Sequence, residues 1–283
     1  MSRGLRREDF KLELLLGLGT TGQVYLARAP DGRPVALKIP RSEVHRDPAL
    51  AERFAREVRL SLGLSHPNLV KGIAGKPYGK EAFLALEYFE EGSLEDRLQK
   101  GPLGRERALS ILRQIAAALS HLHRLGIVHQ DVKPANVFLR GETAKLGDFG
   151  VAKTREDRSP LERAGSPFYM APELFQGGEG TPASDAYSFG VLAYELLTGK
   201  RPFYGETFEE LLAAHLTQTP PPLKDKNPRL VRAVQGLLEK DPKKRAGVEE
   251  FLRALITPSP ASEQAKENPA QKTFWSRILG RKR

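Results

Sequence analysis

The sequence predicts an α+β protein with two lobes, a small N-terminal lobe rich in β-strands with one main helix and a larger, mostly helical C-terminal lobe. Three observations predict this class. Short apolar runs separated by turn residues fill about residues 10–86. One amphipathic segment at 50–64 interrupts them, with apolar residues at helical spacing. From residue 104 onward, several longer segments repeat apolar residues at that spacing.

A glycine-rich turn joins the first two expected strands. Gly17, Gly19 and Gly22 lie between the apolar runs 14–16 and 24–27. Glycine lets backbone amides approach a phosphate closely, because a side chain would block the approach. The motif alone is a weak signal, since G-x-G-x-x-G also begins dinucleotide-binding helices. Here a strand follows instead of a helix, and there is no G-K-[ST] ending typical of a Walker-type P-loop.

The next expected strand carries Lys38 at the end of the run 35–38, and the predicted helix at 50–64 follows it. The apolar positions of this helix are Leu50, Phe54, Val58 and Leu62. Glu57 lies on the same helix. By itself, Glu57 would be interpreted as an ordinary exposed acid.

A strand over 82–89 runs into a connector and ends the small lobe. The segment 104–125 then repeats apolar residues at helical spacing, and Gly126 closes it, so we expect a core helix there. Further helices are predicted at about 183–198, 208–217, 230–240 and 248–256.

Two short loops after the core helix carry the strongest chemical pattern. The first reads H-Q-D-V-K-P-A-N over 129–136, and the second reads D-F-G over 148–150. Phosphoryl transfer depends on positioning and charge neutralisation more than on covalent help from the protein. Each of these polar residues alone could be a solvated surface group. The ordered set indicates phosphate chemistry.

This ordered set resembles the eukaryotic-type (Hanks-type) protein kinases of the Ser/Thr branch, and the compact chain looks like bacterial members. The resemblance covers 10–257 and implies an N-lobe at 10–86, a hinge at 87–92 and a C-lobe at 93–257. It implies ATP and Mg²⁺ as cofactors. It also implies transfer of the γ-phosphoryl group of ATP to Ser or Thr hydroxyls of protein substrates.

The resemblance assigns four catalytic positions. Asp131 would act as the base that accepts or orients the proton of the attacking hydroxyl. Lys133 would neutralise the transferring phosphoryl group. Lys38 would reach the α- and β-phosphates and pair with Glu57.

The resemblance also implies the nucleotide and metal contacts. Asn136 and Asp148 would bind Mg²⁺, which prefers hard oxygen ligands. Leu86 would be the gatekeeper, and backbone groups of the hinge would meet adenine; plain core packing is the alternative reading of these apolar positions. The implied nucleotide contacts are Gly17, Leu18, Gly19, Thr20, Gly22, Val24, Ala36, Lys38, Leu86, Glu87, Phe89 and Phe138.

The segment 165–173 resembles the G-T-x-x-Y-x-A-P-E platform on which a peptide substrate lies. Ser166 replaces the usual threonine, and its hydroxyl would bridge Asp131 and Lys133. Two structural contacts are also implied: a buried ion pair of Glu173 with Arg245, and a cap on the first loop by Asp185.

Two other function classes compete with an active protein kinase. A pseudokinase scaffold would bind nucleotide or partners without catalysis, but such chains typically lose the strand lysine or a loop aspartate, and none is lost here. A small-molecule kinase of similar fold is disfavoured because the substrate platform is complete.

Gln130 departs from the family pattern, because many members have an arginine there that binds a phosphorylated residue. Glutamine carries no charge, so the sequence predicts basal activity without activation-loop phosphorylation. Glu162 could hydrogen-bond Gln130 in place of a phosphate.

Ser61 and Gly72 fall where the family packs apolar side chains between the lobes. Two explanations remain open. The alignment shifts by one residue and brings in Leu60 or Leu62, or the active conformation is weakly held and depends on a partner or on dimerisation.

Composition agrees with a globular intracellular enzyme. The chain has 283 residues, 40% hydrophobic content and no cysteine, which excludes disulfides, thiolate metal sites and cysteine nucleophiles. No signal peptide or run of eighteen apolar residues is present, so we expect a cytoplasmic protein. The net charge is +10, but no motif indicates nucleic-acid binding, and we expect none.

Residues 258–283 have the composition of a disordered basic tail, with six basic and two acidic residues. Apolar residues near its end, at Phe274, Trp275, Ile278 and Leu279, could form a short amphipathic turn. Such a turn would suit peripheral contact with an anionic membrane or a partner groove. A flexible solvated tail is the alternative.

Overall fold

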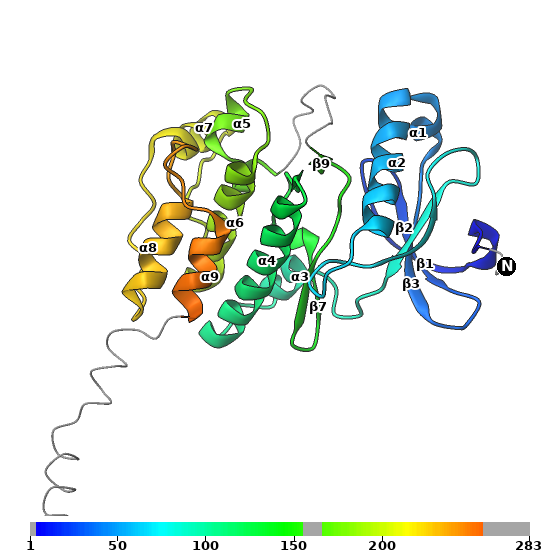
Figure 1. Cartoon of the computed structure of the whole chain (residues 1–283), viewed down its shortest axis with the longest axis horizontal. Helices are drawn as coiled ribbons and strands as arrows, with labels where there is room; N and C mark the ends of the chain where they lie inside the picture. The colour runs from blue at the N-terminus through cyan, green and yellow to red at the C-terminus, as the bar shows by residue number, and fades with distance from the viewer. Residues whose placement is uncertain (1–3, 155–165, 257–283) are drawn as a thin grey trace, which may run out of the picture.

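The structure is a computed structural model that describes residues 4–154 and 166–256. Ser159, Glu162 and the basic tail lie outside the described residues. Figure 1 shows a lobe built on a β-sheet at one end of the molecule and a helical lobe at the other. The predicted α+β class with two lobes is confirmed.

The described part of the N-lobe contains a five-stranded antiparallel sheet in the order β1-β2-β3-β5-β4. Its strands are β1 Lys11–Leu18, β2 Gln23–Arg28, β3 Pro34–Ile39, β4 Gly72–Lys76 and β5 Phe83–Glu87, after a short 3-10 turn at Arg7–Asp9. Phe10, Leu37 and Phe83 are buried together in a small core of this lobe. The turn between β1 and β2 is the glycine-rich segment.

Helix α2 spans Pro48–Gly63 and follows the short α1 at Ser42–Arg46. Asp47 caps α2 by accepting the amide hydrogens of Ala49 and Leu50, and Pro48 suits the first turn. The buried face carries Phe54 and Val58. Leu62, expected on that face, is instead 42% exposed, because it lies in the last turn and reaches only the edge strand β4.

The small residues Ser61 and Gly72 allow α2 and β4 to approach closely. A Cβ atom at Gly72 would lie 2.4 Å from the carbonyl oxygen of Ser61, a distance that real contacts do not reach. Ser61 is buried, and the preceding Leu60 is partly buried against the main hydrophobic cluster, which contains Leu64 and Leu69 as well as the core of the C-lobe. Of the two shifted positions, Leu60 is therefore the one that packs against this cluster, whereas Leu62 is exposed.

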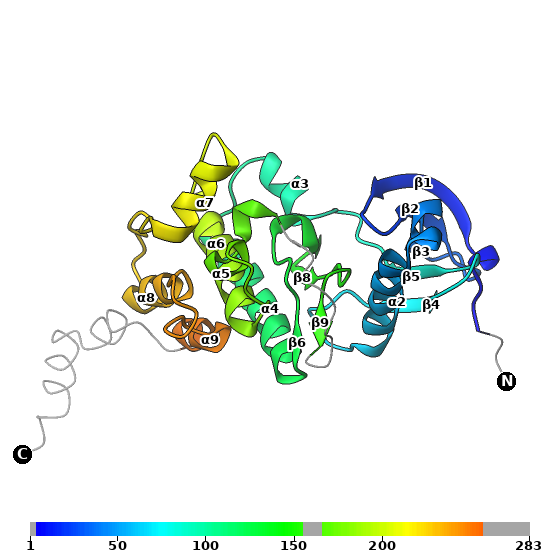
Figure 2. The same cartoon turned by 90° about the horizontal axis from the view of Figure 1, so that it is seen from above.

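The C-lobe is built around two helices, α4 Arg105–Arg124 and α6 Pro182–Thr198, which pack against each other. Gly126, with φ of 73°, follows the end of α4 in the left-handed conformation that glycine permits. The other helices are α3 Leu94–Gln99, α5 Pro172–Phe175, α7 Phe208–Thr217, α8 Pro228–Leu237 and α9 Val248–Ile256. Figure 2 shows α8 and α9 at the end of the molecule opposite the sheet.

The helix expected at 230–240 begins two residues earlier and ends three residues earlier. Asn227 caps α8 by accepting the amide hydrogens of Arg229 and Leu230, and Pro228 occupies its first turn. No helix within the described ranges is long and apolar enough to cross a membrane.

Short strands carry the loops of interest. The hairpin β7 Val137–Arg140 and β8 Thr143–Leu146 separates the two loops, and β6 Ile127–Val128 pairs with β9 Lys153–Thr154 on either side of them. Two 3-10 turns, Pro134–Asn136 and Pro167–Tyr169, complete this region. Both loops therefore leave paired strands at the edge of the C-lobe that faces the sheet.

Candidate active site

A cavity of about 400 Å³ lies between the lobes. Of the predicted nucleotide contacts, Gly17, Val24, Ala36, Lys38, Leu86, Glu87, Phe89 and Phe138 line it. The remaining four, Leu18, Gly19, Thr20 and Gly22, do not line it. The sheet thus supplies an apolar roof and one lysine, while the tip of the glycine-rich turn lies outside the cavity lining.

Lys38 and Glu57 meet at the inner end of this cavity. The Lys38 Nζ atom lies 2.6 Å from both carboxylate oxygens of Glu57, and both residues are buried. Desolvation is the largest effect on the pKa of Lys38 and lowers it, but Glu57 and Asp148 together outweigh it and raise that pKa. Lys38 therefore stays protonated and can offer a charge to an anion in the cavity.

Asp148 lies at the floor of the same cavity and faces its open space. Its φ of 61° is unusual for a residue with a side chain, and its Oδ1 accepts the amide hydrogen of Gly150 at 3.1 Å. Desolvation by surrounding protein opposes ionisation, yet the charge of Lys38 and the Gly150 amide lower the pKa of Asp148. The carboxylate is therefore ionised at neutral pH and available to a cation.

Asp131 sits on the first loop between two donors. Its Oδ2 lies 2.8 Å from Lys133 Nζ and accepts the Asn136 side-chain amide at 2.8 Å. The same amide also donates to the Asp131 carbonyl oxygen at 2.8 Å. These bonds use the Asn136 nitrogen, so its side-chain oxygen remains as an acceptor.

Asn136 and Asp148 suit Mg²⁺ better than a softer metal. Both offer hard oxygen atoms, and Mg²⁺ usually takes one or two protein ligands and completes its shell with phosphate and water. Within the ranges that the structure describes, no group of three His, Cys, Asp or Glu side chains could hold a metal alone. The donor set therefore fits a metal that arrives with a phosphate ligand.

The first loop is anchored on the buried helix α6 through Asp185. Its carboxylate accepts the amide hydrogens of His129 at 2.8 Å and Gln130 at 2.7 Å, and it lies 2.9 Å from His123 Nε2. Gln130 has a positive φ of 67°, so the bonds hold a strained turn in place. The predicted cap by Asp185 is confirmed.

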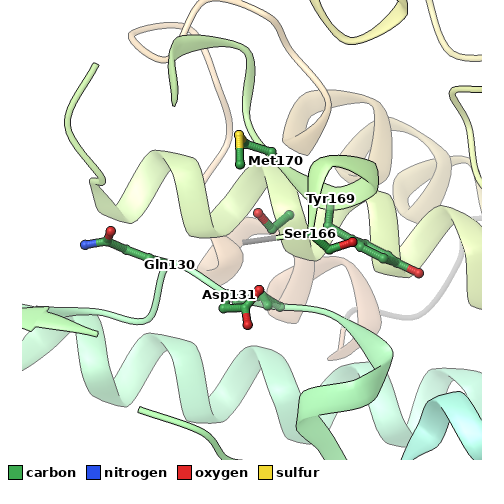
Figure 3. Close-up of a pocket in the computed structure, with 7 residues that line it drawn as sticks. Gln130, Asp131, Ser166, Tyr169 and Met170 are labelled. Carbon is green, nitrogen blue, oxygen red and sulfur yellow. The ribbon is translucent and has the colours of Figure 1, made fainter. Parts of the chain in front are cut away.

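A small pocket of about 10 Å³ separates Asp131 from the predicted substrate platform. Figure 3 shows Asp131 and Ser166 on opposite sides of this pocket, with Tyr169 and Met170 beside Ser166. The expected bridge from Ser166 to Asp131 and Lys133 is not formed: among described residues, the partners of the Asp131 carboxylate are Lys133 and Asn136. These two already occupy its Oδ2 atom.

The platform is fixed to the C-lobe by the ion pair of Glu173 and Arg245. The guanidinium nitrogens lie 2.6 and 2.8 Å from the two carboxylate oxygens, and the Arg245 side chain is fully buried. Arg245 also donates to the carbonyl oxygens of Ala183, Glu239 and Lys240. The predicted buried pair is confirmed.

Gln130 points away from Asp131 and the platform (Figure 3). Its side chain packs on the backbone of Gly180, where a Cβ atom would lie 2.6 Å from Gln130 Cδ. The Nε2 atom is buried, and it has no hydrogen-bond partner in the described part of the chain. The loop therefore presents an amide, rather than a cation, at the family's arginine position.

Several functional contacts were missed by the sequence analysis. Arg53 on α2 donates to the Gly150 carbonyl oxygen at 2.7 Å, which ties the helix to the second loop. Ser93 and Asp96 line the outer cavity and form a capping box at the start of α3. The S-x-x-D spacing was a readable signal for that cap. No local pattern indicated the Arg53 contact.

The hinge is held from outside by the β7–β8 hairpin. Lys145 Nζ lies 2.6 Å from Glu87 Oε1, and the Arg140 guanidinium lies 4.7 Å from the centre of the Phe89 ring. Arg140 also donates to the carbonyl oxygen of Tyr88. Two cations of the C-lobe therefore fix the connector between the lobes.

Residues 10–255 match the family described as protein kinase domain. The chain is 39% identical over 253 residues to the serine/threonine-protein kinase pkn2 of Myxococcus xanthus, a match that covers 83% of this chain and 30% of that protein. It is 32% identical over 304 residues to PknJ of Mycobacterium tuberculosis, covering 97% of this chain and 51% of PknJ.

PknA of Mycobacterium tuberculosis is 36% identical over 253 residues, which cover 83% of this chain and 58% of PknA. The chain thus spans between about a third and somewhat over half of the length of these relatives. With the match over residues 10–255, the chain belongs to the protein kinase family, among the eukaryotic-type (Hanks-type) Ser/Thr kinases of bacteria.

Proposed function

We propose that this protein is an ATP-dependent protein kinase that transfers the γ-phosphoryl group to Ser or Thr hydroxyls of proteins. One observation carries the proposal: the Lys38–Glu57 pair of one lobe and the Asp148 carboxylate of the other converge on a single cavity. Asp131 lies on the adjoining loop, within hydrogen-bond reach of Lys133 and Asn136. Positioned charge of this kind is what phosphoryl transfer requires.

In the proposed mechanism, Asp131 orients the substrate hydroxyl and accepts its proton. Lys133 stabilises the charge on the transferring group, and Lys38 holds the α- and β-phosphates while Glu57 keeps the lysine in position. Mg²⁺, held by Asn136 and Asp148, supplies neutralisation of phosphate charge when bound. The apolar part of the cavity beside the backbone of Glu87 and Phe89 would hold adenine.

A labelling assay tests this function. The full chain is incubated with radiolabelled ATP, Mg²⁺ and a generic basic protein acceptor, and Asp131→Asn and Lys38→Met are compared with the exposed controls Asp31→Asn and Lys224→Met. We expect the two site variants to lose label by roughly 10²- to 10⁴-fold, the usual contribution of acid–base and electrostatic groups. The controls should keep the parent activity.

Three outcomes would contradict the proposal. Labelling that survives both site substitutions would mean a contaminating kinase or a wrong assignment of the site. Nucleotide binding without transfer would favour a pseudokinase scaffold. Transfer to small molecules, with no label on Ser or Thr of the acceptor, would favour a small-molecule kinase.

We further propose that basal activity needs no phosphorylated residue in the activation loop. The uncharged Gln130, packed on Gly180, supports this proposal. Thr154, Ser159 and Ser166 are replaced one at a time by alanine, and we expect the first two variants to remain active. Loss of activity in either one would contradict the proposal, whereas Ser166→Ala would also disturb the substrate platform.

The same proposal extends to the bounds of the kinase domain and to the basic tail. We assign the kinase domain to 10–257 and a basic tail to 258–283, in a cytoplasmic protein whose tail contacts an anionic membrane peripherally. Pelleting with phosphatidylserine vesicles compares the full chain with a version that ends at Thr257. Equal pelleting would remove the membrane contact.

Dimerisation is the remaining question about partners. Because Leu60 packs against the cluster that continues into the C-lobe, we propose that α2 needs no second copy to hold its position. Sedimentation at micromolar concentration should give a monomer. A stable dimer would contradict this view.

A further inference from the structure

The tip of the glycine-rich turn contains two neighbouring threonines in opposite environments. Thr20 is exposed, whereas Thr21 is only 1% exposed. The Thr21 hydroxyl donates to Glu57 Oε2 at 3.3 Å, across 36 positions of sequence. Glu57 is the same carboxylate that pairs with Lys38, so the turn is linked directly to the ion pair of the cavity.

Further contacts seat the turn on strand β3. Gly19 donates its amide hydrogen to the Gly22 carbonyl oxygen at 2.8 Å, which closes the tip. A Cβ atom at Gly22 would lie 2.6 Å from the Ile39 carbonyl oxygen, and one at Gly19 would lie 4.0 Å from Lys38 Nζ. The turn therefore rests close to the lysine that a phosphate would need.

Arg41 holds the other side of the turn. Its Nη2 atom donates to the Thr20 carbonyl oxygen at 3.1 Å. With Thr21 bonded to Glu57 and Thr20 bonded to Arg41, the tip is fixed from both sides.

The cavity lining agrees with a closed turn. Lys38, Glu57 and Asp148 line the inner end of the cavity, but none of the residues 18–23 does. A phosphate chain that reached Lys38 would need backbone amides of the turn beside it. The turn has to move to supply them, and the Thr21–Glu57 bond opposes that movement.

We propose that Thr21 is a positioning residue that latches the glycine-rich turn to Glu57 and thereby sets how strongly the site discriminates phosphorylated nucleotides from the bare nucleoside. This inference rests on the proposed nucleotide site. The closed turn holds Glu57 and α2 in place while the site is empty, and nucleotide phosphates displace the hydroxyl. Adenosine, which has no phosphate, binds without opening the latch.

The expected size of the effect follows from the bond that must break. The apparent affinity for a ligand falls in proportion to the population of the competent state. A single intramolecular hydrogen bond of ordinary net strength corresponds to a factor of about five to ten in that population. Removing the hydroxyl should therefore strengthen phosphate-dependent binding by about that factor.

Calorimetry on the full chain tests the latch. Thr21→Val removes the hydroxyl and keeps the shape, Thr21→Ser restores a donor, and Thr217→Val is a matched control on the exposed face of α7. Each variant is titrated with ADP in Mg²⁺ and, separately, with adenosine. We expect Thr21→Val to bind ADP about five- to tenfold more tightly and adenosine with unchanged affinity. Thr21→Ser and Thr217→Val should match the parent chain.

The outcomes separate the latch from other roles. Unchanged or weaker ADP binding by Thr21→Val would overturn the proposal. An equal change in the affinity for adenosine would overturn it as well, because it would indicate a general change of the cavity. Thr21→Ala, like Thr21→Val, should bind ADP more tightly than the parent chain. Denaturation curves confirm that each variant is folded. A parent chain that binds neither ligand would contradict the proposed nucleotide site itself.

Discussion

Arg245 makes hydrogen bonds to the backbone in addition to its ion pair with Glu173. It pairs with both oxygens of Glu173 and donates to three backbone carbonyl groups, all from a fully buried position. A buried pair contributes little net stability over an apolar pair, but losing one member leaves an uncompensated charge. The structure therefore depends on Arg245 to keep the platform segment attached to the C-lobe.

Replacing Arg245 with methionine should destabilise the protein by about 3–5 kcal/mol, because Glu173 would lose its cation in a buried site. Chemical denaturation followed by circular dichroism measures the change. The double variant Arg245→Met with Glu173→Leu should recover part of the loss. A single-variant loss below about 1 kcal/mol would show that water already reaches the pair.

Two other residues carry strain at the active site. Gln130 and Asp148 adopt positive φ values, which cost about 1–3 kcal/mol each for residues with side chains. Asp185 offsets the first through its bond to the Gln130 amide, and the Gly150 amide bond to Asp148 helps offset the second. Strain of this kind was not predictable from the sequence, because it depends on partners that are distant in the chain or set by the turn.

At the scale of elements, the contact of α2 with β4 decides where Glu57 lies. Ser61 and Gly72 bring the helix and the strand to a spacing that leaves no room for a side chain at Gly72. The same helix carries Glu57 and Arg53, which contact Lys38 and the Gly150 carbonyl. A displacement at one end of α2 is therefore transmitted to the ion pair.

Gly72→Ala tests this transmission. The added methyl group would press on the Ser61 backbone, so we expect a loss of about 1–3 kcal/mol, the usual cost of overpacking, and weaker kinase activity. Gly63→Ala is the control, because nothing lies within 4 Å of the added atom and the φ of Gly63 is not positive. Equal free energies of unfolding for the parent and Gly72→Ala would mean that β4 can move away from α2 without cost.

His215 on α7 gives the C-lobe a predictable response to acid. It is fully buried beside Tyr187, and desolvation together with the charge of Lys240 lowers its pKa to about 4. Below the ordinary pKa of about 6.5, the unfolded chain binds a proton that the folded chain refuses. Stability should therefore fall as the pH drops from about 6.5 to 4 and stay unaffected by this residue above 6.5.

The size of this effect is about 3 kcal/mol between the two pH limits. Denaturation of the parent and of His215→Gln at several pH values isolates it, because carboxylates contribute equally to both. His45→Gln, at an exposed position, is the control and should keep the parent slope. Parallel slopes for the parent and His215→Gln would show that His215 titrates normally.

The elements themselves were largely predictable, because long periodic segments fix helices. The segment 104–125 became α4 at Arg105–Arg124, and 208–217 became α7 with the same ends. Strand β1 is longer than the apolar run suggested, because it begins at Lys11. In its first half, Lys11 and Glu13 alternate with leucines that remain exposed, so this part lacked an apolar run. Contacts that join distant elements, such as Thr21 with Glu57 or Arg140 with Phe89, had no local signal.

At the scale of the whole molecule, the two lobes share one cavity but divide its charged groups. Lys38 and Glu57 belong to the sheet lobe, whereas Asp131, Asn136 and Asp148 belong to the helical lobe. A ligand that touches both sets links the lobes. Its binding then stabilises the folded chain by an amount that grows with the ratio of ligand concentration to dissociation constant.

Magnesium and ADP together should raise the free energy of unfolding by about 2.7 kcal/mol when ADP is present at 100 times its dissociation constant. Chelation of the metal with EDTA should reduce this gain in the free energy of unfolding at the same ADP concentration. In Asp148→Asn, ADP should raise the free energy of unfolding equally with and without Mg²⁺. Thermal and denaturant unfolding of the full chain measure these differences. An equal gain in EDTA for the parent chain would argue against a metal bridge through Asp148.

Compounds that compete for the cavity would meet Arg140 at the outer face of the hinge. Arg140 stacks on Phe89 and leaves about half of its side chain in solvent. An inhibitor scaffold that fills the cavity and extends past Phe89 would place its solubilising group beside this guanidinium. Because Glu90 and Asp96 also line the cavity, an acidic group at that end should gain affinity only where it reaches Arg140, whereas a basic group should gain it where it reaches these carboxylates.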